Sequence, residues 1–188
     1  MAEDARASEV LAFWFPGPGA DERWFRKDPA FDREITDRFL AVHEVAAEGR
    51  LAAWSASARE CLALVLLLDQ FPRNMFRGTR RAFATDAAAL EAARQALGRG
   101  HDRSLRPVEK LFFYLPFEHA ESLAEQQRAC ELIEPLAAFA ETHDVYRYAL
   151  AHRDIIARFG RFPHRNAILG RASTPEEVEF LQQPGSGF

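Results

Sequence analysis

Two segments of the chain repeat the same pattern, in which arginine and asparagine follow a proline. FPRN spans Phe71–Asn74 and FPHRN spans Phe162–Asn166, and each segment comes directly after an apolar run with helical spacing. Arginine presents a planar fork of donors that matches a carboxylate or a phosphate, and asparagine adds amide donors. The repeat therefore indicates either a shared structural role or one composite anion site, but it names no reaction.

The first apolar run ends in a carboxylate that we expect to point into the protein. Asp69 follows Leu62 and Leu66 at helical spacing, so it shares their inward face. A buried carboxylate must be paired with a cation or must hold a proton. If the two repeated segments meet, its natural partners are the arginines Arg73, Arg77, Arg161 and Arg165.

Two histidines are candidates for acid–base chemistry. His152 lies at helical spacing from Tyr148 and Ile155, so we expect its ring to be buried. His119 follows Pro116 in a third junction that contains a proline and that could join the other two. A buried histidine can simply donate its proton to a carbonyl or carboxylate, or it can act in catalysis. The candidate catalytic residues are Asp69, His119 and His152.

The polar residues of the two repeated segments are candidates for binding a ligand. Guanidinium and amide donors near helix ends would suit a carboxylate or a phosphate. The alternative is structural, because helices that end at a proline leave carbonyl groups that arginines can satisfy. The candidate ligand-binding residues are Arg73, Asn74, Arg77, Arg161, His164, Arg165 and Asn166.

The sequence contains no recognised motif for a metal or a cofactor. His119, Glu121, His152 and His164 are suitable ligand types, but their spacing matches no known metal motif. Phosphate-binding loops, dinucleotide-binding glycine patterns and nucleophile elbows are missing as well. We therefore expect neither a metal site nor a cofactor.

Helices are predicted to position all of these residues. Capping residues and apolar helical spacing recur along the chain, and no stretch shows the alternation that is typical of strands. Pro72 and Pro116 are expected to end the helices that reach them. The expected helices span 5–15, 29–48, 57–70, 86–97, 107–115, 119–141, 144–159 and 174–181, followed by a disordered tail at 182–188. This pattern predicts an all-α domain, built either as a bundle or as a solenoid.

Length, composition and charge argue against several classes of protein. A chain of 188 residues suffices for one compact domain spanning 1–188. The net charge of -4 argues against a broad face for nucleic acid. The apolar runs are too short to cross a membrane, and the acidic N-terminus lacks the features of a signal peptide. We expect a cytoplasmic protein that binds neither nucleic acid nor membrane, and the sequence leaves its oligomeric state open.

Five longer motifs follow one another along the chain. They are RWFRKDPAFD at Arg23–Asp32, LLLDQFPRNMFRGT at Leu66–Thr79, FATD at Phe83–Asp86, FFYLPFEHAE at Phe112–Glu121 and RFGRFPHRNAILGRAST at Arg158–Thr174. Together they resemble the bacterial family called domain of unknown function 924, over nearly the entire chain. The resemblance implies a stack of antiparallel helix pairs in a tetratricopeptide-like right-handed superhelix. It implies no established reaction and no catalytic residues.

Two functional hypotheses follow, and a third stays open beside them. The first is a tetratricopeptide-like binding or scaffold protein, in which an arginine-rich concavity receives an acidic or C-terminal protein segment; it rests on analogy of fold. The second is a cofactor-independent enzyme on a small anionic substrate, with Asp69, His119 or His152 as acid or base and Arg73 and Arg165 as charge clamps. In the third, the polar groups form a buried network that specifies the fold, and the function lies elsewhere.

Overall fold

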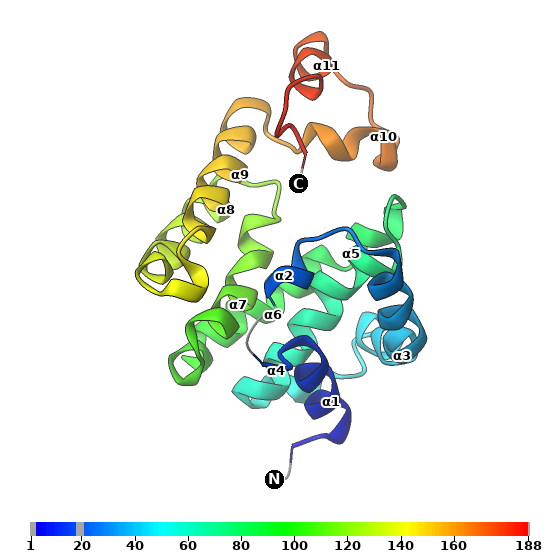
Figure 1. The fold of residues 1–188 in the computed structure, drawn as a ribbon, viewed down its shortest axis with the longest axis vertical. Coiled ribbons are helices and arrows are strands. Elements are labelled where there is room, and N and C mark those ends of the chain that lie inside the picture. The colour runs from blue at the N-terminus through cyan, green and yellow to red at the C-terminus, as the bar shows by residue number, and fades with distance from the viewer. Residues whose placement is uncertain (1–2, 18–20, 188) are drawn as a thin grey trace.

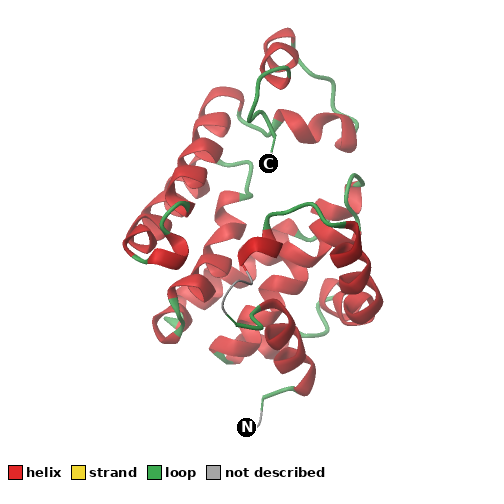
Figure 2. Cartoon of the chain, in the orientation of Figure 1, coloured by secondary structure: helices red, strands yellow, loops and turns green. Residues whose placement is uncertain are grey.

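The computed structural model describes residues 3–17 and 21–187, and every regular element in these ranges is helical (Figures 1 and 2). The α-helices are α1 (Ala5–Trp14), α2 (Asp21–Trp24), α3 (Pro29–Ala47), α4 (Ala58–Val65), α5 (Phe71–Met75), α6 (Asp86–Gly98), α7 (Pro107–Glu118), α8 (Leu123–Ile133), α9 (Val145–Phe159), α10 (Asn166–Leu169) and α11 (Pro175–Leu181). The predicted all-α class is confirmed for this part of the chain. The disordered tail stays a prediction, and its last residue, Phe188, lies outside the described residues.

Capping residues that are visible in the sequence set where two of the helices begin. The Asp28 carboxylate accepts hydrogen bonds from the first free N–H groups of α3, at 2.9 and 3.3 Å. Thr174 and Glu177 form a reciprocal capping box at the start of α11, with N···O distances of 3.2 and 2.7 Å. These side chains satisfy N–H groups that helix geometry leaves without partners.

Aromatic side chains of α1, α3, α5 and α7 form the centre of the core. Trp14 is fully buried, and its ring centroid lies 5.3 Å from that of Phe71 and 5.6 Å from that of Phe112. Phe39 of α3 packs on Phe71 as well, at 5.0 Å. Rings of this size supply a large share of the hydrophobic stabilisation. The core therefore holds α5 and α7, which border the candidate site, in a fixed relation.

The helix that leads to Asp69 does not end at Pro72, so this sequence prediction is wrong. α4 passes into a π-helical turn at Leu66–Gln70, and the chain continues through Pro72 as α5. In this turn the Phe71 N–H bonds to a carbonyl five residues back. The widened turn separates Pro72 from the regular ladder, which a proline would otherwise disrupt because it has no N–H to donate.

Side chains satisfy the carbonyl groups that the π-helical turn releases. Such groups need partners, since an unpaired backbone carbonyl in the interior costs free energy. Two of the three partners come from elements distant in the sequence, which is why a local sequence pattern does not reveal the turn. The Leu67 carbonyl meets Nδ1 of His43 at 2.9 Å, the Leu68 carbonyl accepts from the Thr85 hydroxyl at 2.6 Å, and the Asp69 carbonyl accepts from Arg73.

A second proline also lies inside a helix. α7 continues past Pro116 to Glu118, whereas the sequence predicted an end before this proline. Nearly all side chains of α7 are buried, so packing compensates for the missing backbone bond. His119 is consequently the C-terminal cap of α7. The bounds of the predicted helix 119–141 are wrong, because α8 spans Leu123–Ile133 and 3₁₀ turns follow from Glu134.

The middle of the fold is α7. α4 and α6 contact it on one side, and α8 and α9 lie against it on the other (Figure 1). Helices α10 and α11 form the end of the molecule that is opposite to the N-terminus (Figure 1). The right-handed tetratricopeptide-like superhelix stays a prediction.

Within the described ranges, no helix combines the length and the apolar character that crossing a membrane requires.

Candidate functional site

Five polar residues meet beside the end of α7, and we call them the central cluster. Asp69 lies in the π-helical turn and Arg73 in α5, while Asp86 opens α6. His119 caps α7, and Arg165 belongs to the second repeated segment. The structure thus brings together the two repeated segments and the junction after α7.

Asp69 and His119 form a carboxylate–imidazole pair. The two carboxylate oxygens of Asp69 lie 2.8 and 3.0 Å from Nδ1 of His119. Gln70 donates a further hydrogen bond to the fully buried carboxylate, at 2.6 Å. An ionised carboxylate can only accept, so Nδ1 must carry the hydrogen. The lone pair of the neutral ring therefore lies on Nε2, which makes no hydrogen bond with any of the described residues.

Burial and neighbouring charges keep Asp69 ionised and His119 neutral. Burial alone would raise the pKa of Asp69, but Arg73 and His119 outweigh it and hold this pKa below its ordinary value. Burial and the Arg73 guanidinium lower the pKa of His119, against the opposing effect of Asp69. At neutral pH the His119 ring is therefore a free base with one open nitrogen.

Asp86 links the two arginines of the central cluster. Its carboxylate accepts hydrogen bonds from Nη1 and Nη2 of Arg73 at 3.0 and 3.2 Å, and it lies 3.4 Å from Nη1 of Arg165. The same Nη1 of Arg165 donates to the carbonyl oxygen of His119 at 3.1 Å. The position of His119 consequently depends on both repeated segments.

A second carboxyl–imidazole pair lies next to the first. Oε1 of Glu118 is 3.1 Å from Nδ1 of His152, and this Nδ1 donates its hydrogen bond to the Tyr148 carbonyl at 2.9 Å. Burial, reinforced by the Asp69 charge, raises the pKa of Glu118 to about 8. Burial and the neighbouring His119 lower the pKa of His152 to about 3. Both members of this pair are therefore uncharged at neutral pH, in contrast to the ionised Asp69.

Asn74 of the first repeated segment and Arg77, which lies just beyond that segment, hold a carboxylate of α3. Asp32 accepts a hydrogen bond from Nδ2 of Asn74 at 2.8 Å. It also accepts from Nε and Nη2 of Arg77, at 2.8 Å each. The predicted ligand-binding residues Asn74 and Arg77 thus form a separate cluster that ties α5 to α3.

Asn166 of the second repeated segment and Arg161, which lies just before that segment, build the same arrangement on α11. Glu177 accepts from Nε and Nη2 of Arg161 at 2.6 and 2.8 Å, and from Nδ2 of Asn166 at 3.2 Å. One amide and one guanidinium fork again surround one carboxylate. We call these two arrangements the peripheral clusters. They explain why asparagine recurs in both segments, whereas the fork arginines lie outside the repeat, Arg77 after its segment and Arg161 before its own.

Of the four arginines predicted to accompany Asp69, one contacts it directly. Nη1 of Arg73 lies 3.3 Å from the Asp69 carboxylate. Arg165 joins the same cluster through Asp86, and the other two arginines belong to the peripheral clusters. His164 packs against the ring of Phe162, with the centroids 5.6 Å apart.

Asp86 and Glu118 belong to the site although the sequence alone did not reveal them. Asp86 reads as a capping residue of α6, and this role hides its contacts with two distant arginines. Glu118 lies beyond Pro116, where the helix was expected to have ended. A carboxyl group beside a histidine at the end of an otherwise apolar helix is the signal that could have drawn attention to Glu118.

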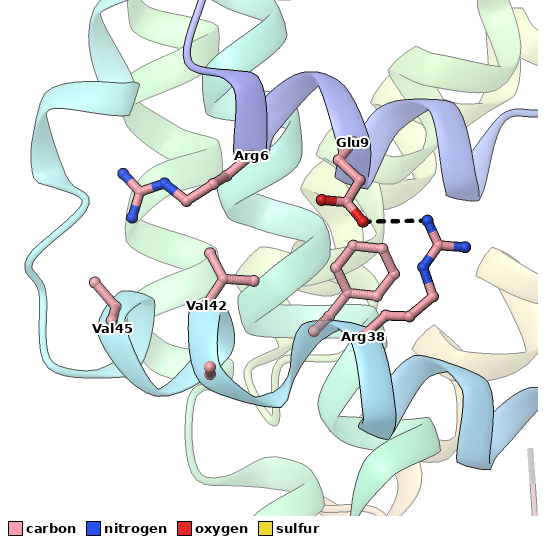
Figure 3. Close-up of a pocket in the computed structure, with 7 residues that line it drawn as sticks. Arg6, Glu9, Arg38, Val42 and Val45 are labelled. Carbon is pink, nitrogen blue, oxygen red and sulfur yellow. Dashed lines mark hydrogen bonds and ion pairs between the residues drawn. The ribbon is translucent and has the colours of Figure 1, made fainter.

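The described part of the chain contains no group of three or more His, Cys, Asp or Glu side chains arranged to hold a metal ion. An open depression of about 280 Å³ lies between α1 and α3 (Figure 3). Arg38 borders it and pairs with Glu9 at 3.2 Å, and Arg6 borders it and pairs with Asp4. None of the candidate residues lines this depression, so we assign it no role.

Comparison with known proteins places the chain in a family. The model for a bacterial protein of unknown function (DUF924) matches residues 10–185. The chain belongs to the DUF924 family. The solved structure of ATU0120, a protein of unknown function from Agrobacterium tumefaciens, is similar with a TM-score of 0.87 and 49% identity, over 95% of this chain and 97% of that chain. No curated protein matches.

The DUF924 family brings no reaction with it, so the chemistry of the site has to follow from its geometry. The central cluster combines the fully buried Asp69 carboxylate, the His119 ring, whose Nε2 has no hydrogen bond with the described residues, and two guanidinium groups. Such a set can accept a proton and can stabilise negative charge.

Proposed function

We propose that this DUF924 protein is an enzyme that removes a proton from a small-molecule substrate, with His119 as the general base. Asp69 orients the ring. The observation that carries the proposal is the pair of contacts from Nδ1 of His119 to both Asp69 oxygens, at 2.8 and 3.0 Å. They favour the tautomer in which Nε2 is free to accept a proton, which is what general-base catalysis requires.

The exposure of the cluster supports access by a small molecule. The side chain of His119 is 14% exposed, and those of Arg73 and Asp86 are 20% and 21% exposed. Asp69, in contrast, is fully buried, so water does not screen its effect on the ring. The arrangement leaves the His119 side chain partly exposed and keeps the orienting carboxylate fully buried.

Binding of a protein segment, the other hypothesis, stays a prediction without added support. It relied on arginines that would offer their charge to an acidic partner. Arg77 and Arg161 already bind carboxylates of the protein itself, so they have little unpaired charge to offer.

Exchange of substrate protons in D2O tests the proposal even while the complete reaction is unidentified. A panel of small metabolites would be incubated with wild type, with His119→Gln and with His143→Gln, a control in which an exposed histidine outside the cluster is changed. We expect deuterium uptake by a panel member that falls about 10²–10⁴-fold in His119→Gln and is unchanged in the control. Equal uptake with wild type and His119→Gln would contradict the proposal.

A further inference from the structure

Arg165 is held rigidly in the interior. The residue is only 6% exposed, and its guanidinium lies 4.7 Å from the ring centroid of Phe83 and 4.4 Å from that of Phe162. Nη1 is fixed by the His119 carbonyl and by Asp86. The aromatic contacts and these two bonds together set the plane of the guanidinium.

The other edge of the same guanidinium, formed by Nε and Nη2, makes no hydrogen bond with the described residues. Nε of Arg165 is buried and has no hydrogen-bond partner among the described residues. Nη2, which completes this edge, likewise makes no bond with them. A buried donor without a partner costs free energy, and its occurrence in a folded protein calls for a ligand or an ordered water.

The peripheral clusters show what this edge binds elsewhere in the molecule. Nε and Nη2 of Arg77 donate to the two oxygens of Asp32, both at 2.8 Å. Nε and Nη2 of Arg161 donate to the two oxygens of Glu177, at 2.6 and 2.8 Å. In both cases the edge matches the spacing of a carboxylate. Arg165 presents the same edge without such a partner among the described residues.

Within the part of the chain that the structure describes, the positive charge of Arg165 is only partly balanced by carboxylates. Asp86, its nearest carboxylate, is shared with Arg73 and lies closer to Arg73. Burial and the neighbouring Arg73 charge lower the pKa of Arg165 to about 10. A further anion on the free edge would reduce this penalty.

We propose that the Nε–Nη2 edge of Arg165 binds a carboxylate or phosphate group of the substrate, which places that anionic group in the central cluster. That the anion belongs to a substrate rests on the function proposed above, whereas anion binding itself does not depend on it. Nη1 of the same guanidinium donates to the His119 carbonyl at 3.1 Å, so the anion-binding edge and the proposed base belong to one cluster. The substrate class is therefore a small molecule that carries a carboxylate or a phosphate group.

Nuclear magnetic resonance of the arginine Nε–H groups tests the anchor in the intact protein. Acetate and inorganic phosphate would be titrated separately, with sodium chloride at equal ionic strength as the reference. We expect the Arg165 Nε–H signal to shift saturably with acetate, with phosphate or with both, and to respond little to chloride. The anion that gives the tighter binding separates a carboxylate from a phosphate substrate.

Calorimetry on two lysine variants adds a matched control. Arg165→Lys keeps the charge but loses the planar edge, so anion affinity should fall at least about tenfold. Arg77→Lys makes the same change in a peripheral cluster and should leave affinity unchanged. No saturable shift in wild type, as expected if water alone occupies the edge, or equal affinity in Arg165→Lys would overturn the inference.

His119→Gln separates this inference from the proposed function. The variant retains the Arg165 edge, so it should still bind the anion although proton removal is lost. If the anion binds but deuterium uptake does not depend on His119, Arg165 remains the anion-binding residue and His119 is not the base. If uptake needs His119 but is equally fast with substrates that lack an oxyanion, His119 remains the base and Arg165 does not bind the substrate.

Discussion

The central and peripheral clusters use the same kinds of side chain, but they differ in how completely these are paired. In each peripheral cluster, an amide and a guanidinium fork surround one carboxylate, Asp32 or Glu177. In the central cluster, Nε2 of His119 and one edge of Arg165 have no partner among the described residues. Polar groups that are paired with one another hold helices together, whereas donors and acceptors that are fixed in position but unpaired can bind a ligand or exchange a proton with it. We therefore assign a structural role to the peripheral clusters and a chemical role to the central cluster, although both kinds of cluster include residues of the repeated segments.

Asp69→Asn should have the largest effect, because it disrupts the central cluster. An amide can donate to Nδ1 of His119, which would move the ring hydrogen to Nε2 and block the base. We expect proton removal to fall about 10²–10⁴-fold. Loss of the countercharge of Arg73 should also lower the free energy of unfolding by about 3–5 kcal/mol. Deuterium uptake and urea unfolding measure the two effects.

Asp32→Asn is the matched control for this change. It makes the same substitution in a peripheral cluster, so uptake per folded molecule should stay as in wild type. Comparable losses of uptake in both variants would mean that the two kinds of cluster do not differ in role.

Glu118→Gln probes the surroundings of the central cluster through the pH dependence of stability. The pKa of Glu118 is raised from 4.5 to about 8 in the folded protein, so the folded state holds this proton more tightly than the unfolded state. This contribution to stability is complete below pH 4.5 and is lost as the pH rises to about 8. The slope is at most ~1.4 kcal/mol per pH unit.

The glutamine variant cannot ionise and should lack this contribution. Its stability relative to wild type should therefore increase between pH 5 and pH 8, as followed by urea unfolding at several pH values. A constant difference across this range would show that Glu118 is ionised in the folded protein.

Asn166→Ala should give the smallest effect, limited to stability. The buried Asn166 amide donates to Ser173 and Glu177, so its loss should cost roughly 1–3 kcal/mol in thermal or urea unfolding. Uptake by the folded fraction should not change. Asn74→Ala, which removes the equivalent amide from Asp32, serves as the parallel test. A specific loss of uptake in either variant would contradict a purely structural role for the peripheral clusters.

Local signals in the sequence predicted the helical class and part of the site. Asp28 and Thr174 begin helices as their capping patterns indicate. Helical spacing also predicted that Asp69 and His152 are buried, which the structure confirms. These features depend on residues within one or two helical turns, and a single sequence contains that information.

The rest of the site depends on contacts between distant segments. Pro72 stays within a helical path because His43 and Thr85 satisfy carbonyls of the π-helical turn. Asp86 reaches Arg165 from a position 79 residues away in the sequence. Helix propensity and the spacing of apolar residues do not reveal partners that are distant in the sequence. The sequence therefore identified the arginines as candidates without showing which carboxylates they bind.

The protonation of the His119 ring decides whether this residue can act as the base, and nitrogen NMR of the intact protein between pH 4 and pH 8 measures it. The expected result is a hydrogen on Nδ1, a free Nε2 at neutral pH, and a pKa below the ordinary value of 6.5. In Asp69→Asn the hydrogen should move to Nε2. A wild-type ring that carries its hydrogen on Nε2, or that is protonated at pH 7, would contradict the assignment of His119 as the base.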